Sequence, residues 1–90
     1  METVKTVFSK KGTTAELFKA YLDDKELIFK NDEATLYLPK NTEQVLKWFA
    51  RGKPGSKYVI AITEPEWARF SHSATLDDSQ KDAGIYWFKV

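Results

Sequence analysis

The sequence predicts an α+β fold, a two-layer sandwich in which two helices cover one face of a mainly antiparallel sheet. Three observations support this prediction. Several short segments are rich in β-branched and aromatic residues, as strands are. Two other segments carry apolar residues at helical spacing. Each of these two begins with a polar residue followed three positions later by Glu or Gln, which is the spacing of a helix capping box.

The composition is that of one small globular domain spanning residues 1–90. Apolar residues make up 42% of the chain and charged residues 30%, which separates it from disordered sequences. Cysteine is absent, which excludes disulfides, thiol catalysis and cysteine-bound metal centres and favours a reducing compartment such as the cytoplasm. Because no run approaches the ~20 apolar residues of a membrane-spanning helix, we expect no membrane partner.

The first third of the chain is predicted to hold a strand and a helix. The strand covers residues 3–9 and ends at a Lys-Lys-Gly turn. Thr13 then begins the helix, and Glu16 completes its capping box. The apolar residues of the next turns share one side: Leu17, Phe18, Tyr21 and Leu22. This segment is therefore predicted to be an amphipathic helix.

Residues 25–30 and 33–38 are predicted to pair as a β-hairpin. They are joined by Asn31-Asp32, two residues that tolerate the left-handed backbone of a tight turn. The inward side chains would then pair across the hairpin, Phe29 with Ala34 and Leu27 with Leu36. Ile28 and Tyr37 would point to the opposite face of the sheet.

A second helix of about ten residues is predicted to follow, because Asn41 and Gln44 repeat the capping-box spacing. Gly52 and Pro54 mark its end. Its buried side would carry Val45, Leu46 and Phe49, with Trp48 at the boundary. Residues 57–63, apolar on both faces, are predicted to form a central strand.

The chain is predicted to close with a short helix over 64–70, a polar connection over 71–84 and a last strand over 85–90. The resulting β-α-β-β-α-β order is that of a ferredoxin-like fold with a C-terminal extension. Right-handed crossovers would place both helices on one side of the sheet. The other face would be an apolar and aromatic surface that a partner or a second copy of the chain could cover.

Aromatic residues make up 14% of the chain, more than a short domain hides easily. Phe18, Phe29, Phe49 and Tyr58 occupy periodic positions and are predicted to be core residues. The remaining candidates define a predicted partner-binding surface, because tryptophan, tyrosine and arginine dominate interface hot spots. Its residues are Ile28, Tyr37, Trp48, Arg51, Trp67, Trp87 and Phe88.

The sequence contains no catalytic or metal-binding motif. His72 is the single histidine, and its neighbours Ser71, Ser73, Asp77 and Asp78 lie in a polar segment without a glycine-framed nucleophile. No calcium-loop spacing accompanies the aspartates. We therefore expect a non-enzymatic protein that needs no cofactor and acts on another protein by occupancy, as an inhibitor or accessory protein does.

Nucleic acid is the alternative partner. Lys47, Arg51, Lys53 and Lys57 form the densest basic region, with Trp48 beside them. Basic side chains next to an aromatic ring are what single-stranded nucleic acid requires, because phosphates are neutralised while bases stack. The formal charge of the whole chain is only +1, so such binding would depend on this local region.

Overall fold

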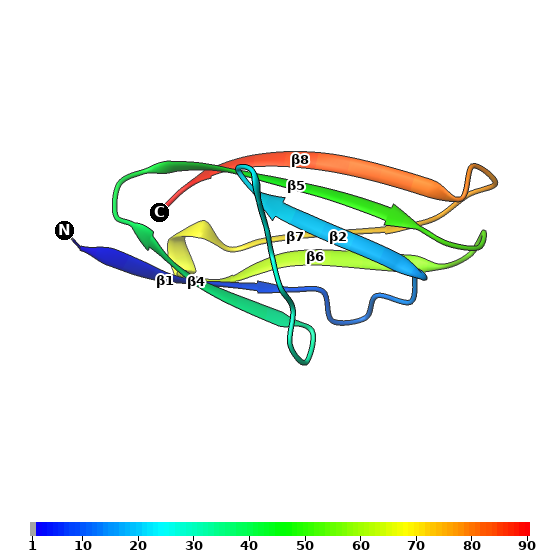
Figure 1. Ribbon diagram of the computed structural model, residues 1–90, viewed down its shortest axis with the longest axis horizontal. Helices are drawn as coiled ribbons and strands as arrows, with labels where there is room; N and C mark the ends of the chain where they lie inside the picture. Colours follow the sequence, from blue (N-terminus) through cyan, green and yellow to red (C-terminus); the bar gives the residue numbers. More distant parts are fainter. Residues whose placement is uncertain (1) are drawn as a thin grey trace.

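The computed structural model describes residues 2–90 and shows an all-β sandwich. Strands account for 62% of these residues and helical positions for 3%. Eight strands form two four-stranded antiparallel sheets, which lie as an upper and a lower layer in Figure 1. The prediction of an α+β, ferredoxin-like fold is therefore wrong, because both segments predicted as long helices are strands.

The strands of the two sheets are interleaved along the chain. Sheet A contains, in spatial order, β4 (Glu33–Pro39), β1 (Thr3–Ser9), β6 (Lys57–Glu64) and β7 (Phe70–Thr75). Sheet B contains β3 (Lys25–Glu26), β2 (Leu17–Leu22), β5 (Glu43–Arg51) and β8 (Lys81–Lys89). A single 3-10 turn, η1 (Glu66–Ala68), connects β6 to β7. The first strand has the bounds that the sequence predicted, and β6 is central in sheet A as expected.

β2 occupies the segment predicted as the first helix. Its apolar residues come as adjacent pairs, Leu17-Phe18 and Tyr21-Leu22, and a two-residue period sends one member of each pair to either face. Ala20 and Leu22 are buried, whereas Lys19 between them is exposed. All six residues of β2 pair with β5. This pairing overrides a helical pattern that the same residues also satisfy.

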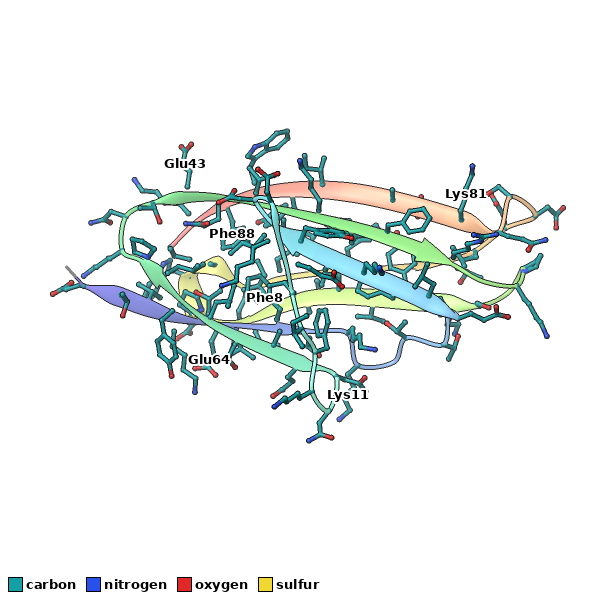
Figure 2. The ribbon with its side chains drawn as sticks, in the orientation of Figure 1. Phe8, Lys11, Glu43, Glu64, Lys81 and Phe88 are labelled. Carbon is teal, nitrogen blue, oxygen red and sulfur yellow. The ribbon has the colours of Figure 1, made fainter. Side chains whose placement is uncertain are left out.

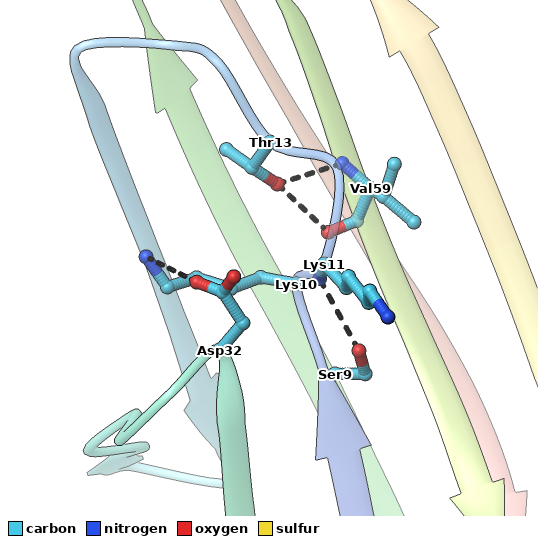
Figure 3. A network of polar contacts seen from close by, with 6 residues as sticks. All are labelled: Ser9, Lys10, Lys11, Thr13, Asp32 and Val59. Atoms are coloured by element: carbon cyan, nitrogen blue, oxygen red, sulfur yellow. Dashed lines mark hydrogen bonds and ion pairs between the residues drawn. The ribbon is translucent and has the colours of Figure 1, made fainter.

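The threonine that was predicted to cap the helix extends sheet A instead. Where β1 leaves β6, Thr13 Oγ1 accepts a hydrogen bond from the Val59 amide at 3.0 Å and donates to the Val59 carbonyl at 3.3 Å (Figure 3). Thr14 Oγ1 accepts from the Lys57 amide at 2.9 Å. The two hydroxyls therefore form hydrogen bonds with the main chain of β6 at positions where β1 no longer pairs with it.

β5 occupies the segment predicted as the second helix. Its burial alternates along nine residues, with Gln44, Leu46, Trp48 and Ala50 buried. Asn41 has a φ of 63° and belongs to a turn, so it caps no helix. Since β5 pairs with β2 on one edge and β8 on the other, tertiary pairing decides its conformation.

The predicted hairpin survives only at its turn. Asn31 and Asp32 have φ values of 51° and 66°, and backbone hydrogen bonds between Lys30 and Glu33 close the turn, which confirms the left-handed Asn-Asp prediction. Residues 27–32, which include this turn, cross from sheet B to sheet A, as Figure 1 shows. β4 pairs with β1 instead, which sets Ala34 opposite Phe8 and Leu36 opposite Thr6. The predicted pairs Phe29–Ala34 and Leu27–Leu36 are wrong.

The C-terminal third holds more strand than predicted. The short helix shrinks to the three residues of η1, and the polar connection contains β7. β8 begins at Lys81, four residues before the predicted start. The two extra lengths of strand form the edges of sheets A and B on the same side of the sandwich.

The inner faces of both sheets form the core. Phe8 of β1 meets Phe88 of β8 edge-to-face with centroids 6.3 Å apart, and Figure 2 shows both rings between the layers. Phe18 of β2 stacks on Tyr58 of β6 at 5.8 Å. The predicted core residues Phe18, Phe29 and Tyr58 pack into or against this core. Phe49 does not, because its position on β5 points outward.

Candidate interaction surface

The outer face of sheet B gathers apolar and basic side chains. Strand alternation directs every second residue of β2, β5 and β8 away from sheet A. These outward residues are Leu17, Lys19, Tyr21, Glu43, Val45, Lys47, Phe49, Arg51, Lys81, Ala83, Ile85, Trp87 and Lys89. Figure 2 shows Glu43 and Lys81 pointing away from the lower layer.

Strand register brings the apolar members of this face together. Trp87 lies opposite Val45, and Ala83 lies opposite Phe49. Residues directly opposite on one face of an antiparallel pair have Cβ atoms about 5 Å apart, so their side chains touch. The apolar residues therefore form a strip that is continuous along β8, through Ala83, Ile85 and Trp87, and that Val45 and Phe49 extend onto β5 on either side of Lys47.

The strip is open to solvent and hollowed. Ile85 is 47% exposed and Trp87 is 64% exposed, although both are large apolar side chains. A hollow of about 460 Å³ lies beside them. Its lining consists of Tyr21, Lys47, Trp48, Phe49, Ala83, Gly84 and Ile85. Since Ala83 is small, an apolar side chain from outside would fit between Phe49 and Ile85.

Positive charge is concentrated on the same face. It carries the five basic side chains Lys19, Lys47, Arg51, Lys81 and Lys89 and two acidic side chains, Glu43 and Glu26, the latter on β3 opposite Tyr21, a net charge of +3 (five minus two). The whole chain has a net charge of only +1. The basic character is therefore local to this face.

The outer face of sheet A differs in chemistry. It presents small and hydroxyl side chains, including Thr63 on β6 and Ser71, Ser73 and Thr75 on β7, and three charged ones, Lys5, Glu33 and Lys57. Tyr37 on β4 is the large exposed side chain there, at 66%. The apolar strip with its cations is thus a property of sheet B.

The predicted partner-binding residues are dispersed in the structure. Arg51 and Trp87 lie on the outer face of sheet B, together with Lys47. Tyr37 lies on the other sheet, Ile28 on the crossing segment, and Trp67 on η1 at one end of the sandwich. Ile28 and Trp67 are 70% and 68% exposed.

Two predicted partner-binding residues are in the core. Trp48 is 6% exposed and Phe88 is 7% exposed, since both point to the inner side of sheet B. Trp48 donates from its indole Nε1 to the Tyr58 hydroxyl at 3.3 Å. Its position beside basic residues in the sequence therefore does not place it beside them in space.

The four residues of the predicted basic region lie in different parts of the structure. Lys47 and Arg51 share the outer face of sheet B. Lys53 lies in the β5–β6 turn, and Lys57 begins β6 in sheet A. Lys19, Lys81 and Lys89 take their place on the face of sheet B, contributed by two other strands.

Sequence reasoning missed Tyr21, Phe49 and Ile85 as surface residues. A helical reading sent Tyr21 and Phe49 to the core. The signal that could have found them is alternation over 17–22, 43–51 and 81–89. Tyr21 falls in phase with Lys19, Phe49 with Lys47 and Arg51, and Ile85 with Trp87.

A second cluster of chemically active groups surrounds the Tyr58 hydroxyl, between the edges β7 and β8. This hydroxyl donates to Asp82 Oδ2 at 2.6 Å and accepts from Trp48 Nε1 at 3.3 Å. His72 Nε2 lies 3.2 Å away. Because the phenol has one hydrogen, which Asp82 receives, His72 can hydrogen-bond to this oxygen only in the tautomer that is protonated on Nε2. All the bonding capacity of the hydroxyl is used.

The Tyr58 cluster is arranged as a structural link. Burial of the Tyr58 ring and the hydrogen bond to Asp82 raise the pKa of its hydroxyl above the ordinary value, the opposite of what a nucleophile or base at neutral pH needs. Tyr58 is 0% exposed, so no substrate reaches its oxygen. Its partners come from β5, β7 and β8 and connect the two sheets where their edges are open.

The serines and aspartates considered around His72 do not assemble with it. Ser71 and Ser73 alternate with His72 on β7 and point to the other face. Asp77 accepts hydrogen bonds from the amide and hydroxyl of Ser79 at 2.9 and 2.6 Å, which lowers the pKa of its carboxyl. Asp77 is therefore a turn residue.

Over residues 2–90, no group of three or more histidine, aspartate or glutamate side chains is placed to hold a metal ion. Within the same range, no helix is long and apolar enough to cross a membrane.

Comparison with protein-family models, curated proteins and solved structures finds no match for this chain. The fold and the face of sheet B define a small β-sandwich with a basic and aromatic surface, and the functional argument is built on that geometry.

Proposed function

We propose that this protein is a small non-enzymatic interaction module that binds an acidic protein partner through the outer face of sheet B. It would act by occupancy, blocking or bridging its partner without chemistry. The observation that carries the proposal is the coincidence of an open apolar strip with a net charge of +3 on one face, while the outer face of sheet A has no such strip and a net charge of only +1 (Lys5 and Lys57 minus Glu33).

The strip has the anatomy of a protein-binding site. Hot spots are aromatic or arginine side chains near the middle of an interface, surrounded by a polar rim. Trp87 and Ile85 are exposed beside the hollow, and Lys81 and Lys89 lie at the two ends of the same strand. Apolar contact would supply affinity, and the cations would select and steer an acidic partner.

Single-stranded nucleic acid is the second candidate, favoured by the five basic side chains that surround Tyr21, Phe49 and Trp87. Two features weigh against it. Trp48, the aromatic residue first considered for stacking, is buried. Leu17, Val45 and Ile85 occupy the face without offering a stacking surface or a phosphate contact. A protein partner accounts for both the charged and the apolar side chains.

Position-specific photo-crosslinking tests the proposal. A benzoylphenylalanine at position 45, beside Trp87, probes the face of sheet B and leaves Trp87 intact. The matched control carries the probe at position 73, on the outer face of sheet A. Both variants are irradiated in cells of the native host, and the crosslinked species are identified by mass spectrometry.

We expect protein adducts at position 45, absent at position 73, whose crosslinked peptides hold more Asp and Glu than Lys and Arg. Nucleic-acid adducts at position 45 would replace the proposal by its alternative, and complex stability would then fall steeply with added salt. Equal adducts at both positions would contradict both.

We also propose the cytoplasm as the site of action, since a cysteine-free chain fits a reducing compartment.

A further inference from the structure

The outer edge of β8 is a long strand edge with free backbone groups. β8 is the last strand of sheet B and pairs with β5 over nine residues, and no other strand of residues 2–90 pairs with it. At about 3.4 Å per residue the edge extends over roughly 30 Å. Exposed edges of this length are templates for another strand.

The hydrogen-bond phase of β8 identifies the free groups. At the two ends of the ladder the Gly52 amide bonds the Gln80 carbonyl, and the Val90 amide bonds the Thr42 carbonyl, so even-numbered residues face β5. In an antiparallel ladder the intervening residues direct N–H and C=O to the opposite edge. The Lys81 carbonyl fits this phase, because it points to Ser79 Oγ, 3.1 Å away, and not to β5. Ala83, Ile85 and Trp87 therefore present their amides outward.

On the opposite side of the sandwich the edge strands are β4, which has seven residues and pairs only with β1, and β2. There β2 is covered in part by β3, and residues 27–32 cross between the sheets with Leu27 buried and Phe29 packed on Phe18. On the β8 side, residues 76–80 join β7 to β8 at one end, and the other contacts between the two edges are made by side chains, through the Tyr58 cluster and the stacked rings of Phe70 and Tyr86 at 3.8 Å.

The charged residues at the ends of β8 determine which kind of strand can pair with its free edge. The odd-numbered residues that offer free amides also carry Lys81 and Lys89 at the two ends and Ala83, Ile85 and Trp87 between them, all on the outer face. A second copy of β8 paired antiparallel along its full length would set Lys81 of each copy opposite Lys89 of the other. Like charges directly opposite destabilise a strand pair. A strand with acidic ends and an apolar middle is complementary.

We infer that an extended segment of a partner protein, with acidic residues at its ends and apolar residues at alternate positions between them, adds to sheet B as a fifth strand along β8. The inference rests on the proposed function, because it gives the mode in which the acidic partner engages the face of sheet B. Main-chain hydrogen bonds would hold the segment, and Trp87 and Ile85 would contact its apolar side chains.

The test uses a synthetic nine-residue peptide with Glu at both ends and alternating Val and Thr between, and a control peptide with Lys at both ends. Amide hydrogen exchange of the protein is followed by NMR with and without peptide. The acidic peptide should slow exchange at Ala83, Ile85 and Trp87 at least about tenfold relative to the control peptide. This measurement needs no variant.

A matched pair of variants separates backbone from side chain. Ile85→Pro removes an outward amide without removing a β5 hydrogen bond, as edge positions allow, whereas Ile85→Ala keeps the amide and shortens the side chain. We expect Ile85→Pro to weaken peptide binding at least about tenfold and Ile85→Ala to weaken it less. Equal losses would overturn the edge mode.

Three further outcomes would also overturn it: no slowing at up to about 1 mM acidic peptide, equal slowing by the basic peptide, or peptide-free protection of β8 in a dimer. If the position-45 probe still captured an acidic protein in any of these cases, the proposed function would stand and only the edge mode would fail. If the probe captured nothing, the proposed function would fail independently.

Discussion

The indole ring of Trp48 lies across Gly84 on the inner side of sheet B. The two residues are opposite each other in the β5–β8 ladder, and a Cβ on residue 84 would overlap Cζ2 of Trp48. Trp48 cannot move aside freely, because its Nε1 bonds Tyr58 and its ring packs on Phe70 with centroids 6.1 Å apart. The glycine in this edge strand is therefore required by core packing.

Gly84→Ala should lower the free energy of unfolding by about 1–3 kcal/mol, as overpacking does. Replacing glycine by alanine also restricts the unfolded chain, which by itself stabilises by about 0.4–1 kcal/mol, and the clash outweighs this gain. Urea denaturation measures the change, with Ala83→Ser as an outward-facing control. In the Gly84→Ala, Trp48→Ala double variant the losses should fall short of additivity by about 1 kcal/mol or more. A stabilised Gly84→Ala protein would refute the packing.

The two tryptophans of sheet B should respond in opposite ways to truncation. Trp48→Ala removes a buried ring and should cost about 3–5 kcal/mol of stability. Trp87→Ala removes a ring that is 64% exposed and should change stability by about 0.5 kcal/mol or less. Thermal unfolding of both variants measures the two losses of stability. Comparable losses would mean that Trp87 is a packing residue and unavailable for binding.

Thr13 should contribute to stability through its hydroxyl alone. Thr13→Val keeps the shape but removes the acceptor for the Val59 amide, and we expect a loss of about 1–2 kcal/mol. Thr13→Ser keeps the acceptor and should lose less. Amide exchange at Val59, measured with the denaturation curves, should accelerate in Thr13→Val only. Unchanged exchange there would contradict the role assigned to this hydroxyl.

Stability should fall at alkaline pH because of Tyr58. Its pKa is raised in the folded protein by burial and by the hydrogen bond to Asp82, while an unfolded tyrosine titrates near about 10. Below that pH both states keep the proton and the stabilisation is complete. As the pH rises further, the unfolded chain loses its proton first, so stability declines until the folded pKa is passed.

Tyr58→Phe should remove this part of the decline. Urea midpoints of both proteins at about pH 8 and about pH 11 provide the comparison, and the wild-type midpoint should fall more between them. Parallel declines would show that Tyr58 does not contribute to the alkaline loss.

The sequence predicted strands where the local signal had one interpretation. The β-branched run at 3–9 and the apolar run at 57–63 form strands as expected, and the Asn31-Asp32 turn has its expected backbone. In the two segments predicted as helices, the apolar spacing fits a helix and a strand alike. Strand partners decided between the two: β5 for the first segment, and β2 and β8 for the second. The residues of these two segments do not by themselves show which strands they pair with.

The surface could be predicted only in part for the same reason. Arg51 and Trp87 were singled out from residue type, and both lie on the face of sheet B. Trp48 and Phe88 were grouped with them on the same ground of residue type, but strand alternation directs both side chains to the inner face of sheet B. Lys19, Lys81 and Lys89 could not be added before the sheet order was known.

The most direct test of the central claim measures how tightly the partner identified by crosslinking binds face variants, by isothermal titration calorimetry. Trp87→Ala and Lys47→Glu alter the outer face of sheet B, and Ser73→Ala and Thr35→Ala alter that of sheet A. We predict that each of the first pair raises Kd about tenfold or more and that each of the second changes it about twofold or less. Equal losses from both faces, or a loss confined to the sheet A variants, would contradict the claim that sheet B carries the binding surface.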